Sequence, residues 1–221
     1  LRNAKDSFDL LDQLAKSAGS RDNETLGGYL QNVSENTTID PLNHVLARWK
    51  SEYLRSPNET LNPKRVLEKI DEWKDLIDSV DLDSFLQQEN KNQIQKFLRP
   101  DVRSYTHVIQ AVSSSIDERS HRRKQENQNK LRFIDALLER LIQQSKTDSV
   151  IQPDIMSFSA VMNAWTKSDG VKSVGYDVSS PSKKVEELLL CMEQLHEEGH
   201  PNLQPNVVIY NIFSYILLLL D

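Results

Sequence analysis

The feature that most constrains the fold is a sequence pattern that returns along the chain. It reads PDIMSFSAVMNAW from Pro153 to Trp165, PDVRSYTHVIQAV from Pro100 to Val112, and PNVVIYNIF from Pro205 to Phe213. In each copy Pro-Asp or Pro-Asn is followed by an aliphatic residue, three positions later by an aromatic residue, and then by a small polar residue. The pattern predicts a repeat protein, in which each unit shares its core with its neighbours.

A weaker copy, TIDPLNHVLARW, has Leu42 in place of the aromatic residue and Asn43 as the polar residue. The register points, which are the aliphatic residues of the four copies, lie much farther apart than the roughly 34 residues of a tetratricopeptide unit. We expect the excess to form insertions, because each hairpin needs only its neighbours' faces to bury its own stripe. The register points are Ile39, Val102, Ile155 and Val207.

The register divides the chain into predicted units. They are a partial leading repeat with a polar insertion at 1–38, repeats at 39–101, 102–154 and 155–206, and the first helix of a further repeat at 207–221.

Apolar residues with helical spacing predict two helices, A and B, in each unit. Helices A are expected from about Pro41 to Tyr53, Arg103 to Ser114, and Met156 to Lys167. The stripes expected on helices B are Val66, Ile70, Trp73 and Ile77; Leu131, Ile134, Leu138, Leu141 and Ile142; and Val185, Leu188, Leu189, Met192 and Leu195.

Capping residues predict where the helices B begin and end. Asn62 and Ser180 are expected to be N-caps, each with a proline at the first helical position, and Gly199 with Pro201 is expected to end the last helix B. The charged stretch at 117–130 is expected to be a solvated loop.

Composition limits the possible partners. The net charge of -6 and the pI near 5.5 give no general attraction to nucleic acid, so an RNA site must be a local groove. The single cysteine, Cys191, excludes an internal disulfide framework and fits a reducing compartment. The Asn-x-Ser/Thr sequons are expected from chance in a chain rich in these residues, so we do not predict secretion.

The apolar stretch from Val207 to Leu220 is the one membrane candidate. It is short of the roughly 18 residues that span a bilayer, and Asn211 and Ser214 interrupt it. We expect a buried helix with its continuation missing. Since the chain opens on Leu1 and stops within this run, we expect it to be a fragment that lacks any targeting segment.

These residues resemble the pentatricopeptide repeat (PPR) family, whose motif begins with aliphatic-x-x-aromatic-Asn/Ser/Thr and closes with Pro-Asp or Pro-Asn. The resemblance covers about Ile39 to Leu217. It implies an all-α, right-handed solenoid of helical hairpins that binds single-stranded RNA, one base per repeat, in the groove lined by helices A. It also implies a role in RNA processing, stability or translation in a mitochondrion or plastid, where other RNA-processing proteins are potential partners. No catalytic group, cofactor, metal or membrane is predicted.

By the same resemblance, particular side chains contact the RNA. The implied base-reading pairs are Asn43 with Asp101, Thr106 with Asp154, and Ser159 with Asn206, which the family associates with uracil, guanine and adenine; Asn211 is a first member without its partner. The implied base-wedging residues are Arg103, Met156 and Val208, and Lys167 is the implied phosphate contact. Asp40 stands at the wedging position of the first copy, where it would repel phosphate.

Three other features of the sequence suggest alternatives to RNA reading. A tetratricopeptide-like protein-binding scaffold also stacks helix pairs, but it lacks the closing Pro-Asp or Pro-Asn. His196-Glu197-Glu198-Gly199-His200 satisfies the H-E-x-x-H pattern of zinc hydrolases, but Gly199 and Pro201 are expected to end the helix across it. The basic cluster Arg119, His121, Arg122, Arg123 and Lys124 is expected to be a solvated charge run rather than a phosphate site.

Overall fold

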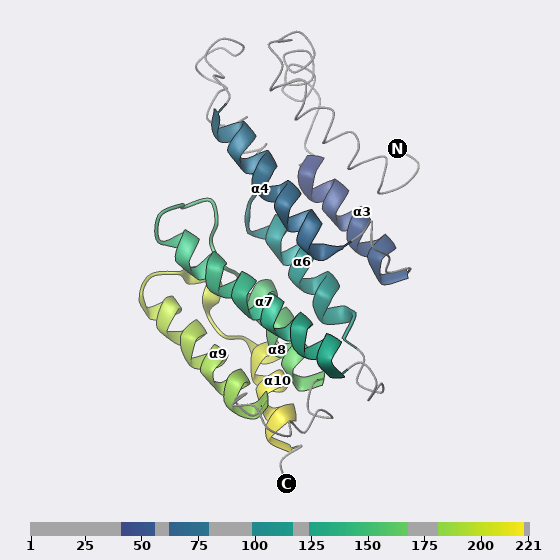
Figure 1. The fold of residues 1–221 in the computed structure, drawn as a ribbon. Coiled ribbons are helices and arrows are strands. Elements are labelled where there is room, and N and C mark those ends of the chain that lie inside the picture. The colour runs from purple at the N-terminus through teal and green to yellow at the C-terminus, as the bar shows by residue number, and fades with distance from the viewer. Residues whose placement is uncertain (1–40, 56–61, 80–98, 117–123, 168–180, 219–221) are drawn as a thin grey trace. The chain divides into compact units, whose positions relative to one another are not determined.

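The structure of the protein is a computed structural model, and it describes residues 41–55, 62–79, 99–116, 124–167 and 181–218. These residues form seven α-helices and a short 3-10 helix, with no strand among them (Figure 1). The prediction of an all-α protein is confirmed. The elements are α3 (Pro41–Arg55), α4 (Pro63–Ser79), α6 (Val102–Ser114), α7 (Lys124–Ser145), α8 (Ile155–Lys167), α9 (Pro181–Glu197), η5 (Pro201–Leu203) and α10 (Val207–Leu218).

Several predicted features lie outside the described residues. They are the partial repeat and insertion at 1–38, Ile39, Asp40, most of the basic cluster, and the cap Ser180.

The chain divides into two compact units, Leu1–Val108 and Ile109–Asp221, and the boundary falls within α6. The predicted repeat boundaries and the right-handed solenoid concern how successive hairpins follow one another, and they stay predictions.

In the first unit, the buried side chains come from α3, α4 and the start of α6. Asn62 caps α4, since its side-chain oxygen accepts the backbone N–H of Lys64 at 2.9 Å and Pro63 is the first helical residue, as expected. The Trp49 and Tyr53 rings of α3 stack with their centroids 5.5 Å apart. The buried side chains are Leu42, Val45, Leu46, Trp49 and Tyr53 on α3, the expected stripe Val66, Ile70, Trp73 and Ile77 on α4, and Tyr105 and Val108 on α6.

In the second unit, α8 is the central helix. It packs against α7, α9 and α10, and most of its residues are buried. The stripe predicted for α9 is buried in full, and that predicted for α7 is buried except for the half-buried Ile142. The hydrophobic periodicity therefore identified the packed faces of both helices.

A half-buried carboxylate connects three of these helices. Asp135 of α7 accepts the indole N–H of Trp165 on α8 at 2.9 Å, and Lys184 of α9 lies 3.9 Å from it. Burial raises the pKa of Asp135, while the Trp165 hydrogen bond and the Lys184 charge oppose that rise.

The predicted loop at 117–130 is wrong in its second half, because α7 already begins at Lys124. Two contacts of Lys130 stabilise the first turns of α7. Its ammonium pairs with Glu126 one turn earlier at 2.8 Å and donates to the Ser115 carbonyl at 3.0 Å. Asn127, which lies between Glu126 and Lys130 in the sequence, is buried. One side of this polar turn therefore faces the protein interior.

Helix α9 ends as predicted. Gly199 has a φ of 105°, a conformation that favours glycine, and its N–H donates to the His196 carbonyl at 3.1 Å. The His200 N–H reaches back to the Leu195 carbonyl at 3.1 Å, which completes a Schellman motif.

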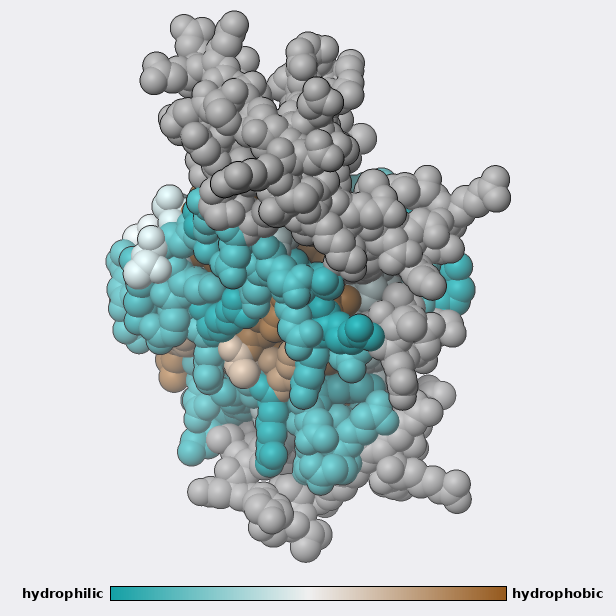
Figure 2. Space-filling model, turned by 45° about the horizontal axis from the view of Figure 1, so that its top comes forward, coloured by the Kyte–Doolittle hydropathy of each residue, from teal (hydrophilic) through white to brown (hydrophobic). Residues whose placement is uncertain are grey.

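The terminal helix α10 is less buried than expected. Ile209, Ile212 and Ile216 form its one buried stripe, whereas Val207 and Leu218 are 74% and 73% exposed. In the described part of the chain, no helix combines the length and apolar character needed to cross a membrane. On the face shown in Figure 2, hydrophilic side chains predominate and apolar ones reach the surface in a limited area between them.

Candidate functional site

The same type of side chain begins the first helix of three predicted repeats. Helices α6, α8 and α10 start at the register points Val102, Ile155 and Val207, each directly after the closing Asp or Asn of the motif. Asp101 Oδ1 accepts the Arg103 N–H at 2.9 Å, Asp154 Oδ1 accepts the Ser157 N–H at 2.8 Å, and Asn206 Oδ1 accepts the Val208 N–H at 3.0 Å. The closing residue is therefore the N-cap of the next helix A.

Two of these caps are reciprocal. The Ser104 hydroxyl accepts the Asp101 N–H at 3.3 Å, and the Ser157 hydroxyl accepts the Asp154 N–H at 3.1 Å. Sequence reasoning missed both serines, although a polar residue three positions after a cap is the signal of a capping box. Ile209 holds the equivalent place in α10, and its side chain cannot form this bond.

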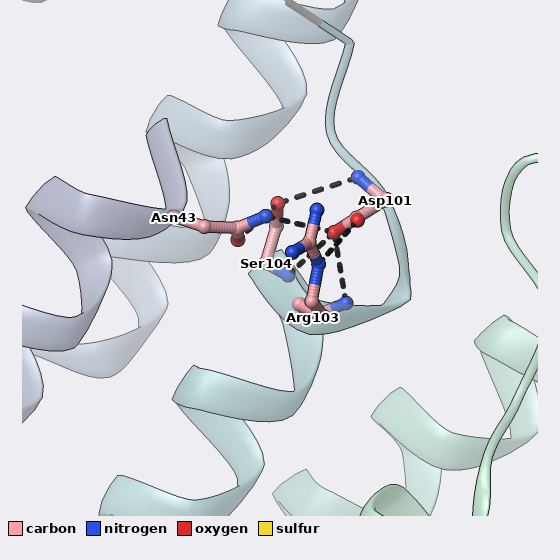
Figure 3. A network of polar contacts seen from close by, with 4 residues as sticks. All are labelled: Asn43, Asp101, Arg103 and Ser104. Carbon is pink, nitrogen blue, oxygen red and sulfur yellow. Dashed lines mark hydrogen bonds and ion pairs between the residues drawn. The ribbon is translucent and has the colours of Figure 1, made fainter. Parts of the chain in front are cut away.

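In the first unit, the predicted pair Asn43 and Asp101 is in contact (Figure 3). The Asn43 amide of α3 donates to Asp101 Oδ1 at 2.9 Å, and its oxygen accepts the Ser104 hydroxyl at 2.9 Å. Arg103 pairs with the other carboxylate oxygen of Asp101 at 2.7 Å. Asn43 is only 7% exposed, so its amide orientation is fixed by side chains at the start of α6.

The other predicted base-reading residues differ in exposure. Thr106 in the first unit is 5% exposed, and its hydroxyl oxygen has no hydrogen-bond partner among the described residues. In the second unit, Ser159 is 9% exposed and donates to the Met156 carbonyl at 3.2 Å, while Asn211 is exposed. Thr106 and its predicted partner Asp154 belong to different units. A groove shared by Thr106, Ser159 and Asn211 stays a prediction.

The predicted wedging residues are all exposed. Arg103, Met156 and Val208 occupy the second position of α6, α8 and α10, where a side chain in the first turn can meet a ligand. Met156 and Val208 are among the larger apolar side chains exposed on the described surface. Met and Val offer apolar contact to a base, and Arg offers a guanidinium plane.

Lys167, the predicted phosphate contact, is the last residue of α8. Its ammonium lies 3.4 Å from the Ser113 carbonyl near the end of α6. A cation there complements the negative end of a helix dipole, which gives Lys167 a structural role.

In the first unit, His107 responds to the charged side chains around it. Burial, followed by the positive charge of Lys50, lowers the pKa of His107 from 6.5 to about 4. Asp101 opposes this shift and Arg103 adds to it. Burial also lowers the pKa of Lys50. His107 is therefore neutral at pH 7. The charged side chains that act on it are Lys50, Arg103 and Asp101.

The H-E-x-x-H stretch lacks the geometry of a zinc site. Helix α9 ends at Glu197, so His200 does not continue the helical face of His196, and His196 Nδ1 lies 3.3 Å from the His200 carbonyl oxygen. Across the described ranges, no group of three or more His, Cys, Asp or Glu side chains is placed to hold a metal ion.

Comparison of the chain with protein-family models found no match, and comparisons with curated proteins and with solved structures found none either.

Proposed function

We propose that the chain is a PPR-like helical-repeat protein that binds single-stranded RNA through the first turns of its helices A. One observation carries the proposal. Helices α6, α8 and α10 start at equivalent residues, are capped by the same type of side chain, and expose the side chain at their second position. Three first turns built alike are what a ligand with a repeating backbone requires.

In this proposal the exposed second-position side chains separate the bases, and the caps contact their edges. Asn206 is exposed, and Asp101 and Asp154 are half-buried, so each cap has a polar side chain near the surface. The buried first members of the pairs are Asn43, Thr106 and Ser159. In this proposal they position the caps by contacts from the protein interior, as Asn43 does when it donates to Asp101. The expected order of preferred bases is 5′-U-G-A-3′, and the expected setting is organellar RNA processing, stability or translation.

The decisive experiment changes one cap. Asn206→Asp is expected to move the preference at the third base from adenine toward guanine, by the roughly 1–3 kcal/mol of a good base contact. Asp caps a helix as well as Asn does, so α10 should keep its start. Affinities would be measured for four RNAs that differ only at that base, on a background sequence found by RNA selection.

Asn202→Asp is the matched control, because it makes the same charge change at an exposed residue of η5 outside the cap. It should leave the base preference unchanged. Equal affinity of the wild-type chain for all four RNAs would refute base reading.

A protein-binding helical scaffold is the second candidate. It is favoured by the exposed apolar side chains of α10, including Val207 and Leu218. Failure of RNA selection to enrich any sequence would leave this candidate as the better one.

A further inference from the structure

The closing residue before α6, Asp101, already accepts hydrogen bonds at both of its carboxylate oxygens. Oδ1 accepts the Asn43 amide at 2.9 Å, and Oδ2 accepts Arg103 Nε at 2.7 Å (Figure 3). Oδ1 also accepts the backbone N–H of Arg103 at 2.9 Å. A base edge that approached Asp101 would therefore have to displace a donor that is already in place.

Asn43, the predicted first member of this base-reading pair, is engaged on both sides of its amide. Its nitrogen donates to Asp101 and its oxygen accepts the Ser104 hydroxyl, each at 2.9 Å. At 7% exposure, the side chain offers a ligand little surface. Asn43 and Asp101 thus stabilise the start of α6, and base reading at this repeat requires another side chain.

Arg103 is the most exposed side chain of this network. Its side chain is 62% exposed, whereas that of Asp101 is 19% exposed. The bond from Nε to Asp101 fixes the direction of the guanidinium plane, because the N–H donors of arginine form a rigid fork. The Nη donors of such a fork match two neighbouring acceptors, and guanine offers that arrangement with O6 and N7. Single-stranded RNA displays this edge of its unpaired bases.

We propose that Arg103 reads the base at the first repeat and selects guanine through O6 and N7. Asp101 is a positioning residue in this arrangement, because it holds Nε, and Asn43 holds Asp101 in turn. The inference rests on the proposed RNA binding and deepens it, since the preferred first base becomes guanine in place of the uracil that the resemblance implies. The side chains of Met156 and Val208 carry no donors, so α8 and α10 cannot read a base in this way.

The test measures affinity for four RNAs that differ only at the first base, on the background sequence found by RNA selection. The wild-type chain should bind the guanine RNA at least about fivefold more tightly than the other three, the lower end of the range for a bidentate arginine contact. Arg103→Lys keeps the charge but not the fork, so it should abolish this preference. Asp101→Asn keeps a cap on α6 but removes the charge that holds Nε, so it should reduce the preference at least about twofold.

Arg65→Met is the matched control for Arg103→Met, since it removes an exposed arginine of α4 that lies outside the network. Arg103→Met should lose the guanine preference. Arg65→Met should leave all four affinities within about twofold. Circular dichroism would establish that each variant keeps its helices.

The possible results separate guanine reading from RNA binding as such. A wild-type preference for uracil, or for no base, would overturn guanine reading while RNA binding stands. So would a guanine preference that Arg103→Lys leaves unchanged. An equal loss of affinity for all four RNAs in Arg103→Met would assign Arg103 to stacking or to a phosphate instead. Failure of the wild-type chain to bind any RNA would refute the proposed function together with this inference.

Discussion

At the scale of single residues, the half-buried Asp135 combines a favourable hydrogen bond with an unfavourable loss of hydration. Its carboxylate accepts the Trp165 N–H, but burial raises its pKa. A raised carboxyl pKa means that the folded state binds the proton more tightly than the unfolded state does. The contribution of Asp135 to stability therefore falls as pH rises from the unfolded pKa through the folded one.

Two substitutions at Asp135 separate these effects. Asp135→Asn keeps an acceptor for Trp165 and removes the buried charge, so the free energy of unfolding at pH 7 should be unchanged or higher. Asp135→Leu leaves the indole N–H without its acceptor and should lower that free energy by about 1–3 kcal/mol. Urea unfolding followed by tryptophan fluorescence measures both, and equal losses in the two variants would contradict this account.

His107 predicts a second pH dependence, of opposite sign. Its pKa is lowered to about 4, first by burial and then by Lys50, so the unfolded state binds a proton between that value and the usual 6.5 while the folded state does not. The stability from this neutral histidine is full above about pH 6.5 and is lost as pH falls toward 4. An NMR titration should give an imidazole pKa near 4 for His107.

Lys50→Met supplies the comparison for His107. It removes the second cause of the shift and should raise the imidazole pKa partway toward 6.5, with burial still lowering it. An imidazole pKa near 6.5 in the wild-type chain would contradict this account of His107. So would a pKa that Lys50→Met leaves unchanged.

The sequence pattern singled out three closing residues as base-reading groups but did not predict that they cap helices. Asp101, Asp154 and Asn206 stand out because they close each motif, and Asn43 was paired with Asp101 by position. Asn43 is 7% exposed, and its oxygen accepts the Ser104 hydroxyl. Both features depend on how α3 packs against the start of α6, and a local sequence pattern carries no information on that packing.

At the scale of elements, the capping boxes of α6 and α8 stabilise the starts of these helices. The Ser157 hydroxyl both accepts the Asp154 N–H at 3.1 Å and donates to its carbonyl at 2.8 Å. Ser157→Ala should lower the free energy of unfolding by roughly 0.5–2 kcal/mol, the range for losing a helix cap. Ser149→Ala, at an exposed turn residue, should cost less than about 0.5 kcal/mol.

Chemical denaturation of the two variants provides the comparison. Equal midpoints for Ser157→Ala and Ser149→Ala would show that the box adds nothing to the stability of α8.

The bounds of the helices A were predicted to within two residues at each end, whereas the start of α7 was not. The register points mark the first residue of α6, α8 and α10, and the apolar stripes identify the buried faces of α4 and α9. The error at α7 arose because a polar, charged sequence carries little periodic signal. There the Glu126–Lys130 pair and the Lys130 contact to the Ser115 carbonyl support a turn that hydrophobicity does not mark.

At the scale of the whole molecule, net charge limits how RNA could be held. The chain has a net charge of -6, and in the first turns of α6, α8 and α10 the sole cationic side chain is Arg103, which pairs with Asp101. For single strands each neutralised phosphate adds about -0.7 to the slope of log K against log salt. We expect a slope shallower than about -4.

The salt series would be measured on the selected RNA between low and physiological ionic strength. A steeper slope that becomes shallower in an Arg122→Ala, Arg123→Ala double variant would assign the main contact to the basic cluster instead of the first turns.

The path of successive hairpins stays a prediction. Periodicity and caps act within one helix or between helices close in sequence. The packing of α8 among α7, α9 and α10 joins segments separated by insertions of unequal length. The sequence pattern therefore predicts hairpins better than it predicts the path that successive hairpins follow.

The reciprocal capping boxes also affect the order of folding. Starting a helix is unfavourable because several residues must be ordered for a single hydrogen bond, and a box adds bonds among those same residues. The first turns of α6 and α8 can thus form without first closing a long loop. In α10, Ile209 replaces the serine and stabilises its turn through burial. We expect α10 to become helical only once a surface is present for Ile209 to pack against.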